Sequence, residues 1–359
     1  MKRNFAQKGL LLAAFALALP FSASLAFAEP AAKPITIEIN SKKSLVNMMS
    51  VDSTNLTENG IKAAKLFYDF LEKGNRKSAE EASQIYDQII PKENFGGDYT
   101  ALQWLIRYSL APKAEQQHFA KNIYDQGFLD FFAANDYAQL KEYLIRKYKL
   151  ANMQDKDPAE GIKRRAFLED FILFENPRRE EWEKSSKMVE SLHLKKGAKV
   201  VDIGSGPGYF TQKFSKAVGD TGKIYAIDTV QEHLDYINNF DTKHGIKNIQ
   251  TVLTEDHTIN MADKEKVDVA WMCSLYHIIY VTYVEAAKDQ FVESIKAALK
   301  PNGTLYIADN GIVPDGVLPY HAPYIDKRLL IGQLQAYGFK FVKEYQFIPQ
   351  RYILEFKKQ

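Results

Sequence analysis

Hydrophobic positions in the second half of the chain form short continuous runs with helical stretches between them. The apolar runs cover residues 199–203, 223–227, 249–253, 267–272 and 304–308. Continuous apolar runs of this length are typical of strands that are covered on both faces. The stretches between them show helical spacing and cover residues 210–218, 230–243 and 284–299. This alternation predicts an α/β fold, doubly wound around a mostly parallel sheet with right-handed crossovers.

The first half of the chain has a mainly helical pattern. Apolar residues recur at helical spacing from Ile61 to Leu71, ahead of Gly74. Ser78 and Glu81 form a capping box for a helix that is expected to stop at Pro91. Further helices are expected at residues 100–108, 113–132 and 137–148, and a brief alternation at 35–39 predicts a strand.

Aromatic side chains are dense in this helical half. Their helical spacing favours a bundle core over the alternative, a lid or an acceptor-binding surface. The charged stretch from Ala151 to Glu160, which contains Pro158, is expected to be a linker. We therefore expect a mainly helical domain of unknown role at residues 29–157, followed by an α/β domain at residues 158–359.

The N-terminus has the composition of a secretory signal peptide. Lys2, Arg3 and Lys8 precede an apolar run over residues 9–20, and an Ala-x-Ala cleavage pattern ends at Ala28. Cleavage there predicts a periplasmic or secreted protein, or a cytoplasmic one if the signal is not used. The apolar run falls short of the about 20 residues that span a bilayer, so no stable membrane span is expected after cleavage.

Charge and composition exclude several classes of function. Loss of residues 1–28 removes three positive charges and changes the formal net charge from +2 to −1, which does not suit a nucleic-acid binder. The one cysteine, Cys273, permits no intrachain disulfide. The seven histidines show no paired metal-ligand spacing, so no metal site is expected, and no Gly-x-Ser-x-Gly elbow of a serine hydrolase occurs.

A glycine turn follows the first apolar run of the α/β half. Gly204, Gly206 and Gly208 allow a sharp turn and a close approach of a ligand to the backbone. Asp228 lies 20 residues beyond Gly208, at the end of the next strand, where a carboxylate can accept hydrogen bonds from both ribose hydroxyls. The dinucleotide fingerprint would require a third glycine where Tyr209 stands, which argues against NAD or FAD.

From about Glu175 to the C-terminus, the chain resembles the class I, seven-strand Rossmann-like S-adenosylmethionine-dependent methyltransferases. The matching segments are the glycine turn, the strand ending in Asp228, the strand 267–272, the Leu-Lys-Pro-Asn-Gly turn at 299–303 and a terminal hairpin over 333–358. A narrower likeness to an exported bacterial subgroup covers Phe174 to Trp182. That subgroup commonly ends in Leu-Pro-Arg-Gln-Tyr-Phe, whereas this chain has Gln350 and Arg351 in the reverse order.

The resemblance implies S-adenosylmethionine as cofactor and a set of residues around it. The residues implied to bind the cofactor are Asp202, Gly204, Ser205, Gly206, Gly208, Tyr209, Asp228, Glu255 and Asp256. His277 and Tyr276 follow the fourth strand and are candidates for the catalytic base and an acceptor-pocket wall. Both also have structural interpretations, as a histidine bonded to a nearby carbonyl and as simple packing. Ser274 stands where relatives often carry Asp or Asn.

The sequence thus predicts methyl transfer to an unidentified acceptor, either a small molecule or an envelope component. The alternative is a non-catalytic protein that binds S-adenosylmethionine or adenosylhomocysteine and uses the helical domain for interaction. The acceptor, the acceptor atom and the oligomeric state are left open.

Overall fold

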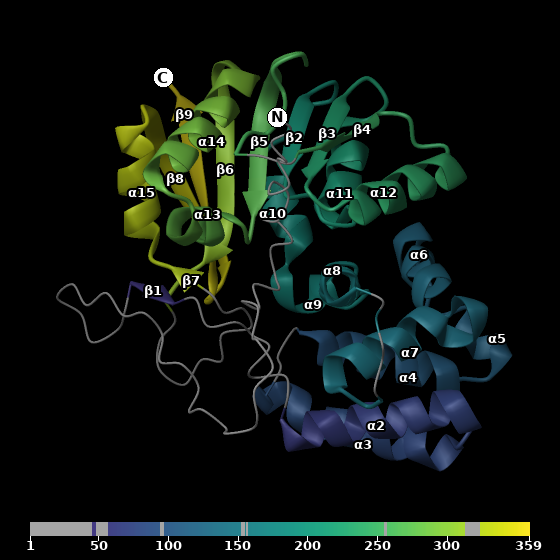
Figure 1. Ribbon diagram of the computed structural model, residues 1–359. Coiled ribbons are helices and arrows are strands. Elements are labelled where there is room, and N and C mark those ends of the chain that lie inside the picture. The colour runs from purple at the N-terminus through teal and green to yellow at the C-terminus, as the bar shows by residue number, and fades with distance from the viewer. Residues whose placement is uncertain are drawn as a thin grey trace, which may run out of the picture.

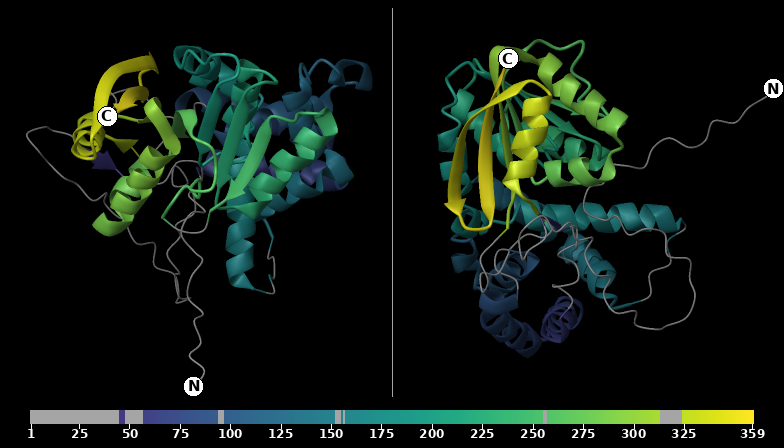
Figure 2. Two further views of the ribbon diagram at one scale, coloured as in Figure 1. Left: turned by 90° about the horizontal axis from the view of Figure 1, so that it is seen from above. Right: turned by 90° about the vertical axis from the view of Figure 1, so that its left-hand side faces the viewer.

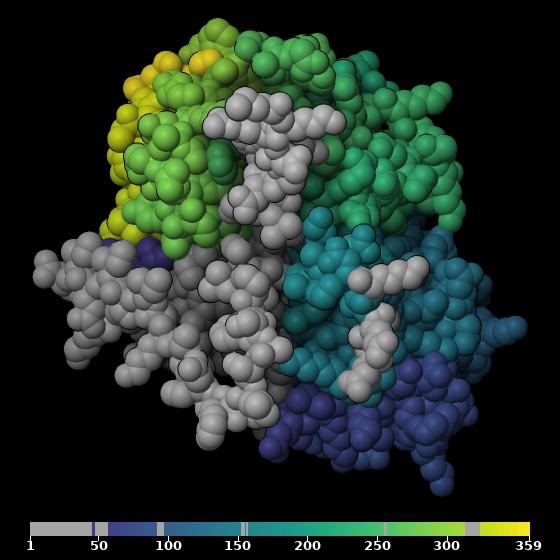
Figure 3. Space-filling view, in the orientation of Figure 1, coloured from purple at the N-terminus to yellow at the C-terminus, as the bar shows by residue number. Residues whose placement is uncertain are grey.

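The computed structural model describes residues 45–47, 57–93, 97–151, 155, 157–254, 257–312 and 324–359. The signal-peptide prediction and the strand expected at 35–39 lie outside these residues. An α/β half and a helical half adjoin each other, with α8 (Pro158–Phe174) and α9 (Arg179–Glu183) between them (Figure 1; Figure 3). None of the helices in the described ranges is long and apolar enough to cross a membrane.

A seven-stranded sheet forms the centre of the α/β half, with strand order β4-β3-β2-β5-β6-β9-β8. The strands β2 to β6 are parallel to one another, and β9 pairs antiparallel with both β6 and β8. This confirms the predicted fold, including its terminal antiparallel hairpin. The strands are β2 (Lys199–Ile203), β3 (Lys223–Asp228), β4 (Ile249–Leu253), β5 (Val267–Cys273), β6 (Leu299–Asn310), β8 (Phe339–Ile348) and β9 (Arg351–Lys358).

Helices cover both faces of the twisted sheet (Figure 2). Neighbouring residues of a strand enter different cores: Val200 packs with the helices on one face and Val201 with those on the other. The first face is covered by α10 (Ser185–Ser191), α11 (Tyr209–Val218) and α12 (Gln231–His244). The second is covered by α13 (Tyr276–Thr282), α14 (Glu285–Ala298) and α15 (Lys327–Ala336).

The helical half has its own core, which confirms the interpretation of its aromatic residues as packing. Phe67, Tyr86, Phe128 and Phe132 are buried in this core. Several helix boundaries differ from those expected. The helices are α2 (Glu58–Lys73), α3 (Arg76–Glu93), α4 (Asp98–Leu110), α5 (Lys113–Gln116), α6 (Ile123–Phe132) and α7 (Ala134–Tyr148).

Three local predictions in this half were wrong. The helix expected over 113–132 is divided, because the Asn122 side chain accepts hydrogen bonds from two backbone amides and starts a new helix. The predicted capping box is absent, since Ser78 donates to Asp69 instead and α3 begins at Arg76. Pro91 does not stop α3 but lies in its last turn.

The expected boundary at residue 157 does not separate the two cores. Asp157 caps α8, and Phe167 and Phe171 of this helix lie in the helical core. The same helix contacts the α/β half, where the Phe171 and Tyr236 rings meet edge to face with centroids 4.6 Å apart. The helix α8 therefore connects the two halves.

A short strand pair ties an early segment of the chain to a late one. β1 (Val46–Asn47) pairs antiparallel with β7 (Tyr324–Ile325) at the edge of the α/β half (Figure 1). Val46 and Ile325 are both buried in the core on the second face of the sheet. The sequence did not predict this pairing.

Candidate functional site

A cleft opens at the carboxyl ends of β2, β3, β4 and β5. This is the edge at which open α/β sheets bind their ligands. The cleft contains about 650 Å³ of space outside the protein atoms, part of it open to solvent. Its walls include Gly204 and Gly206 after β2, Asp228 at the end of β3, Thr254 after β4 and Ser274 after β5.

The glycine turn after β2 has a backbone that suits few other residues. Gly204 has a φ of 72° and Gly206 a φ of 54°, both in the left-handed region. A Cβ atom on Gly204 would lie 2.8 Å from Cδ2 of Leu275, which also lines the cleft. The turn thus brings bare backbone to the cleft wall, as the sequence predicted.

The Asp228 carboxylate faces this turn. Its Oδ2 accepts a hydrogen bond from the Gly206 amide at 2.8 Å. Its Oδ1 accepts bonds from the amides of Thr229 and Val230 at 2.8 and 2.9 Å. Burial acts to raise the pKa of Asp228, but His233 and these amides outweigh it and hold the pKa below its usual value. Asp228 is therefore an ionised acceptor in the cleft wall, suited to hydroxyl donors.

Three other predicted cofactor residues, Asp202, Ser205 and Gly208, are not among the residues that line the cleft. Asp202 is buried and accepts a hydrogen bond from the Thr211 hydroxyl at 2.6 Å, and burial raises the pKa of Asp202 to about 7. Gly208 precedes α11 with a φ of 111°. Ser205 donates to Ile227 through its backbone amide. Glu255 and Asp256 lie outside the described residues, next to Thr254, which does line the cleft.

The two candidate catalytic residues do not line the cleft, contrary to the expected placement. His277 is fully buried; its Nδ1 lies 2.7 Å from Oδ1 of Asp309, and its backbone amide donates to Oδ2. Its Nε2 is buried, and no residue in the described ranges hydrogen-bonds to it. Tyr276 is also buried and donates from its hydroxyl to Gln333 of α15 at 2.7 Å. Their catalytic roles stay predictions.

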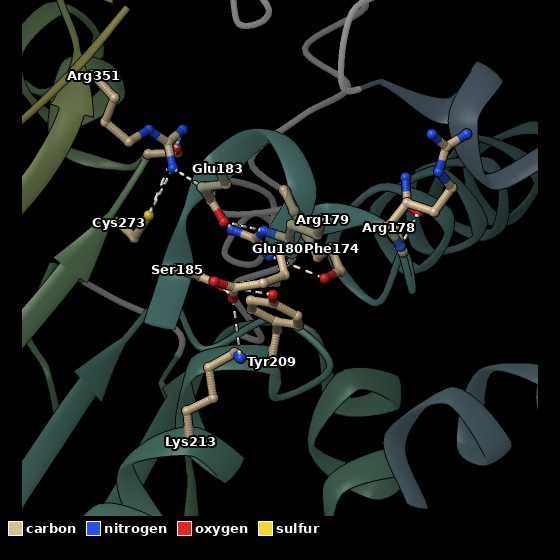
Figure 4. Close-up of polar contacts among 12 residues, drawn as sticks. Phe174, Arg178, Arg179, Glu180, Glu183, Ser185, Tyr209, Lys213, Cys273 and Arg351 are labelled. Atoms are coloured by element: carbon tan, nitrogen blue, oxygen red, sulfur yellow. Dashed lines mark hydrogen bonds and ion pairs between the residues drawn. The ribbon is translucent and has the colours of Figure 1, made fainter. Parts of the chain in front are cut away.

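Tyr209 turns away from the cleft into a buried polar network (Figure 4). The Arg179 guanidinium lies 4.3 Å from the centroid of the Tyr209 ring and pairs with Glu183. Glu183 also accepts from Arg351 of β9, whose Nη2 donates to the Ser274 hydroxyl at 2.5 Å. The network joins the Phe174–Trp182 segment to the strand that begins at Arg351, two segments of the subgroup likeness. The swapped Arg351 therefore has a structural partner.

The cleft-wall residues that sequence reasoning missed include two from α8 and one from α12. Asp170 and Phe174 come from α8, one helical turn apart, and His233 comes from the first turn of α12. His233 lies five residues after Asp228, and this spacing could have indicated it. No local signal indicated α8, because only the packing of the two halves brings this helix to the cleft.

A family model described as a methyltransferase domain matches residues 194–323. The protein-L-isoaspartate O-methyltransferase of Methanosarcina mazei is 31% identical over 121 residues, which cover 33% of this chain and 44% of that protein. A probable cobalt-precorrin-6B C(15)-methyltransferase of Saccharolobus solfataricus is 35% identical over 81 residues, or 22% of this chain and 41% of that protein. The chain thus spans less than half the length of either relative.

Among solved structures, a SAM-dependent methyltransferase from Aquifex aeolicus is similar, with 26% identity and a TM-score of 0.44 over 50% of this chain and 93% of that one. The family match covers the glycine turn, Asp228 and the strands from β2 to β6. The match of residues 194–323 to a methyltransferase domain agrees with the resemblance of the α/β half to the class I, Rossmann-like methyltransferases, and the strand order of the sheet is the one expected from that resemblance.

Proposed function

We propose that the protein transfers a methyl group from S-adenosylmethionine to a small-molecule or envelope acceptor. The observation that carries this proposal is the cleft itself, which combines a Cβ-free glycine turn with the buried, ionised Asp228 at the ends of β2 and β3. These groups fit an adenosyl ligand, because they offer backbone to its amino-acid portion and an acceptor to its ribose hydroxyls.

The residues of the cleft would bind the cofactor and orient it. Gly204 and Gly206 would hold the amino-acid portion of the cofactor, and Asp228 would hold the ribose. Bound S-adenosylmethionine supplies a methyl group that is already activated by its sulfonium. Apolar side chains such as Phe174 and Leu275 line part of the cleft and would reduce the contact of a bound cofactor with water. Positioning an acceptor in line with the methyl group accounts for several kcal/mol of barrier lowering.

A second candidate is a protein that binds the cofactor and does not turn it over. One observation favours it: His277 and Tyr276, the candidate catalytic pair, are buried and do not line the cleft. A catalytic base is needed only for a protonated acceptor such as an alcohol or a phenol. The position of His277 therefore limits the acceptor chemistry and does not exclude transfer.

Two measurements separate these functions. Calorimetry should show adenosylhomocysteine binding to the wild-type protein, weakened by more than about 1 kcal/mol in Asp228→Ala because a buried hydrogen-bonding partner is lost. Asp235→Asn, an exposed change on α12, should leave the affinity unchanged. Absence of binding to the wild type would refute both candidates.

Transfer of a labelled methyl group should then be screened against cell-envelope extracts and small molecules. Isoaspartyl peptides and precorrins come first, because the names of the two relatives indicate such acceptors. Label in any acceptor supports the enzyme. Binding without transfer across the whole screen supports the second candidate.

We also infer that the protein is exported, from the charge and apolar pattern of residues 1–28. Cell fractionation with N-terminal sequencing tests this. A mature chain that starts at Glu29 in the periplasm or medium is the expected result, and an intact Met1 on a cytosolic protein would contradict it.

A further inference from the structure

The cleft has a wall that lies outside the matched methyltransferase domain. Asp170 and Phe174 of α8 line it, although the family match begins at residue 194. Phe174 lies over the glycine turn, since a Cβ atom on Gly206 would be 3.5 Å from its Cδ2. The helical half therefore reaches the site at which the cofactor is proposed to bind.

Within this wall, His233 lies between two carboxylates from different halves of the chain. Its Nδ1 is 3.4 Å from Oδ1 of Asp228, and its Nε2 is 3.7 Å from Oδ2 of Asp170. Only 2% of His233, 4% of Asp170 and 8% of Asp228 is exposed, so water screens these charges weakly. The Phe167 ring of α8 lies against the imidazole, with centroids 5.4 Å apart.

The charges around His233 favour its protonated form. Burial alone would lower the pKa of His233, but Asp228 outweighs it, with smaller contributions from Asp170 and Glu232, and the pKa is raised. Glu175, at the end of α8, also interacts with His233 at longer range. The groups that face the imidazole from β3, α8 and α12 are thus all acidic, and a cation between them reduces their mutual repulsion.

The two oxygens of Asp228 are engaged unequally. Oδ1 has three donors around it: the amides of Thr229 and Val230 and the His233 ring. From the described residues, Oδ2 accepts one hydrogen bond, donated by Gly206, and a carboxylate oxygen can accept two. The contact with His233 therefore fixes the carboxylate through Oδ1 and keeps acceptor capacity on Oδ2.

We propose that His233 and Asp170 are positioning residues of the methyl-donor site: the imidazolium, held between Asp170 and Asp228, orients the Asp228 carboxylate toward the ribose, and the helical half thereby completes the site. This inference builds on the proposed function, because it requires the cofactor to bind beside Asp228. It assigns the helical half a direct part in cofactor binding.

The expected pH dependence follows from the sign of the shift. Because the pKa of His233 is raised above its usual value of 6.5, the imidazolium is the main form at pH 6.5 and is lost as the pH rises through the raised value. A bound ligand excludes water while both carboxylates stay in contact, which strengthens the charge interactions. A further rise of about one unit in the pKa of His233 on ligand binding corresponds to about tenfold tighter binding at pH values below the titration of His233 than at pH values above it.

The test combines calorimetry with NMR on the full mature chain. Adenosylhomocysteine affinity is measured from pH 6 to 9 for the wild type, His233→Gln and Asp170→Asn. The wild-type affinity should fall severalfold with rising pH. His233→Gln should be weaker at pH 6.5 and should show a clearly smaller fall, with only the pH dependence of buried acids such as Asp202 left. Asp170→Asn should move the fall to lower pH. Asp235→Asn removes an exposed carboxylate from the same helix as His233 and should follow the wild type.

The NMR arm does not depend on ligand. The imidazole signal that disappears in His233→Gln should titrate above the usual value of 6.5, and its titration should move to lower pH in Asp170→Asn. Equal affinities for the wild type and Asp170→Asn at every pH, or an unchanged titration of His233, would overturn the inference while leaving the proposed function intact. A wild type that binds no adenosylhomocysteine refutes the proposed function itself, and the NMR titration still tests the contact.

Discussion

Glu183→Gln should destabilise the protein far more than an equivalent change two residues earlier on the same helix. The Glu183 carboxylate is fully buried between Arg179 and Arg351, whose side chains are 6% and 1% exposed. Loss of its charge leaves two buried guanidinium groups beside a neutral amide. Removal of one partner from a buried ionic cluster costs about 3–5 kcal/mol, a large part of the total stability of a typical domain.

Thermal unfolding, followed by circular dichroism or calorimetry, measures the effect. At about 2 °C per kcal/mol for a protein of this size, we expect Tm to fall by at least about 6 °C. Glu181→Gln is the matched control, because Glu181 lies on the same helix and pairs with Arg178 but is 62% exposed. An exposed ion pair contributes less than about 1 kcal/mol, so the control should shift Tm by no more than about 2 °C.

A double variant tests whether the charges of Glu183 and Arg351 stabilise each other. Glu183→Gln combined with Arg351→Met removes one charge of each sign, and its destabilisation should be smaller than the sum of the two single changes. Equal Tm values for Glu183→Gln and Glu181→Gln would refute the reasoning, as would strict additivity in the double variant.

Three further predictions concern the glycine turn, a buried acid and the candidate base. Gly204→Ala should weaken adenosylhomocysteine binding because its Cβ atom displaces Leu275 at the cleft. Gly245 has a similar φ of 67° and no neighbour within 4 Å, so Gly245→Ala should cost about 1 kcal/mol of stability, as the left-handed backbone of Gly204 also would, without affecting binding. Burial raises the pKa of Asp241 to about 6, so the wild type loses stability as the pH rises from 4 to 7. The stability of Asp241→Asn should equal that of the wild type at pH 4 and exceed it by about 1–2 kcal/mol at pH 8. Equal urea midpoints for the two proteins at pH 8 would contradict this. His277→Gln should lower methyl transfer to a hydroxyl acceptor by about 100-fold without changing adenosylhomocysteine affinity if the histidine is the base, and an unchanged rate would leave it a structural role.

Much of the α/β half could be predicted because its signals are local. The parallel strands β2 to β5 are short and largely apolar, and β2 and β4 have the predicted bounds. The glycine turn and Asp228 were also readable, since glycine spacing and a carboxylate at a strand end reflect the ligand they face. These features depend on residues within one βαβ unit.

The rest depends on contacts between distant segments. Asp170 reaches the cleft only because α8 packs against α12, and Arg351 is bound by Glu183, 168 residues earlier in the sequence. The same limit applies to Tyr276, since the sequence places it after β5 but cannot show that α15 supplies its partner, Gln333. The place of a residue at the end of a strand predicted that it lies at the edge of the sheet where the cleft opens. Which side chains face the cleft is determined by tertiary packing.

The pairing of β1 with β7 gives the helical half two points of attachment. Val46 is anchored in the α/β core before the helices begin, and α8 leads back to that half after them. Residues 57–157 are thus attached to the α/β half at both ends of the segment. A shortened chain that starts at α8 would lose β1 from the α/β half together with the helices. The folding and stability of the α/β half should therefore be measured before any loss of activity is attributed to the missing helices.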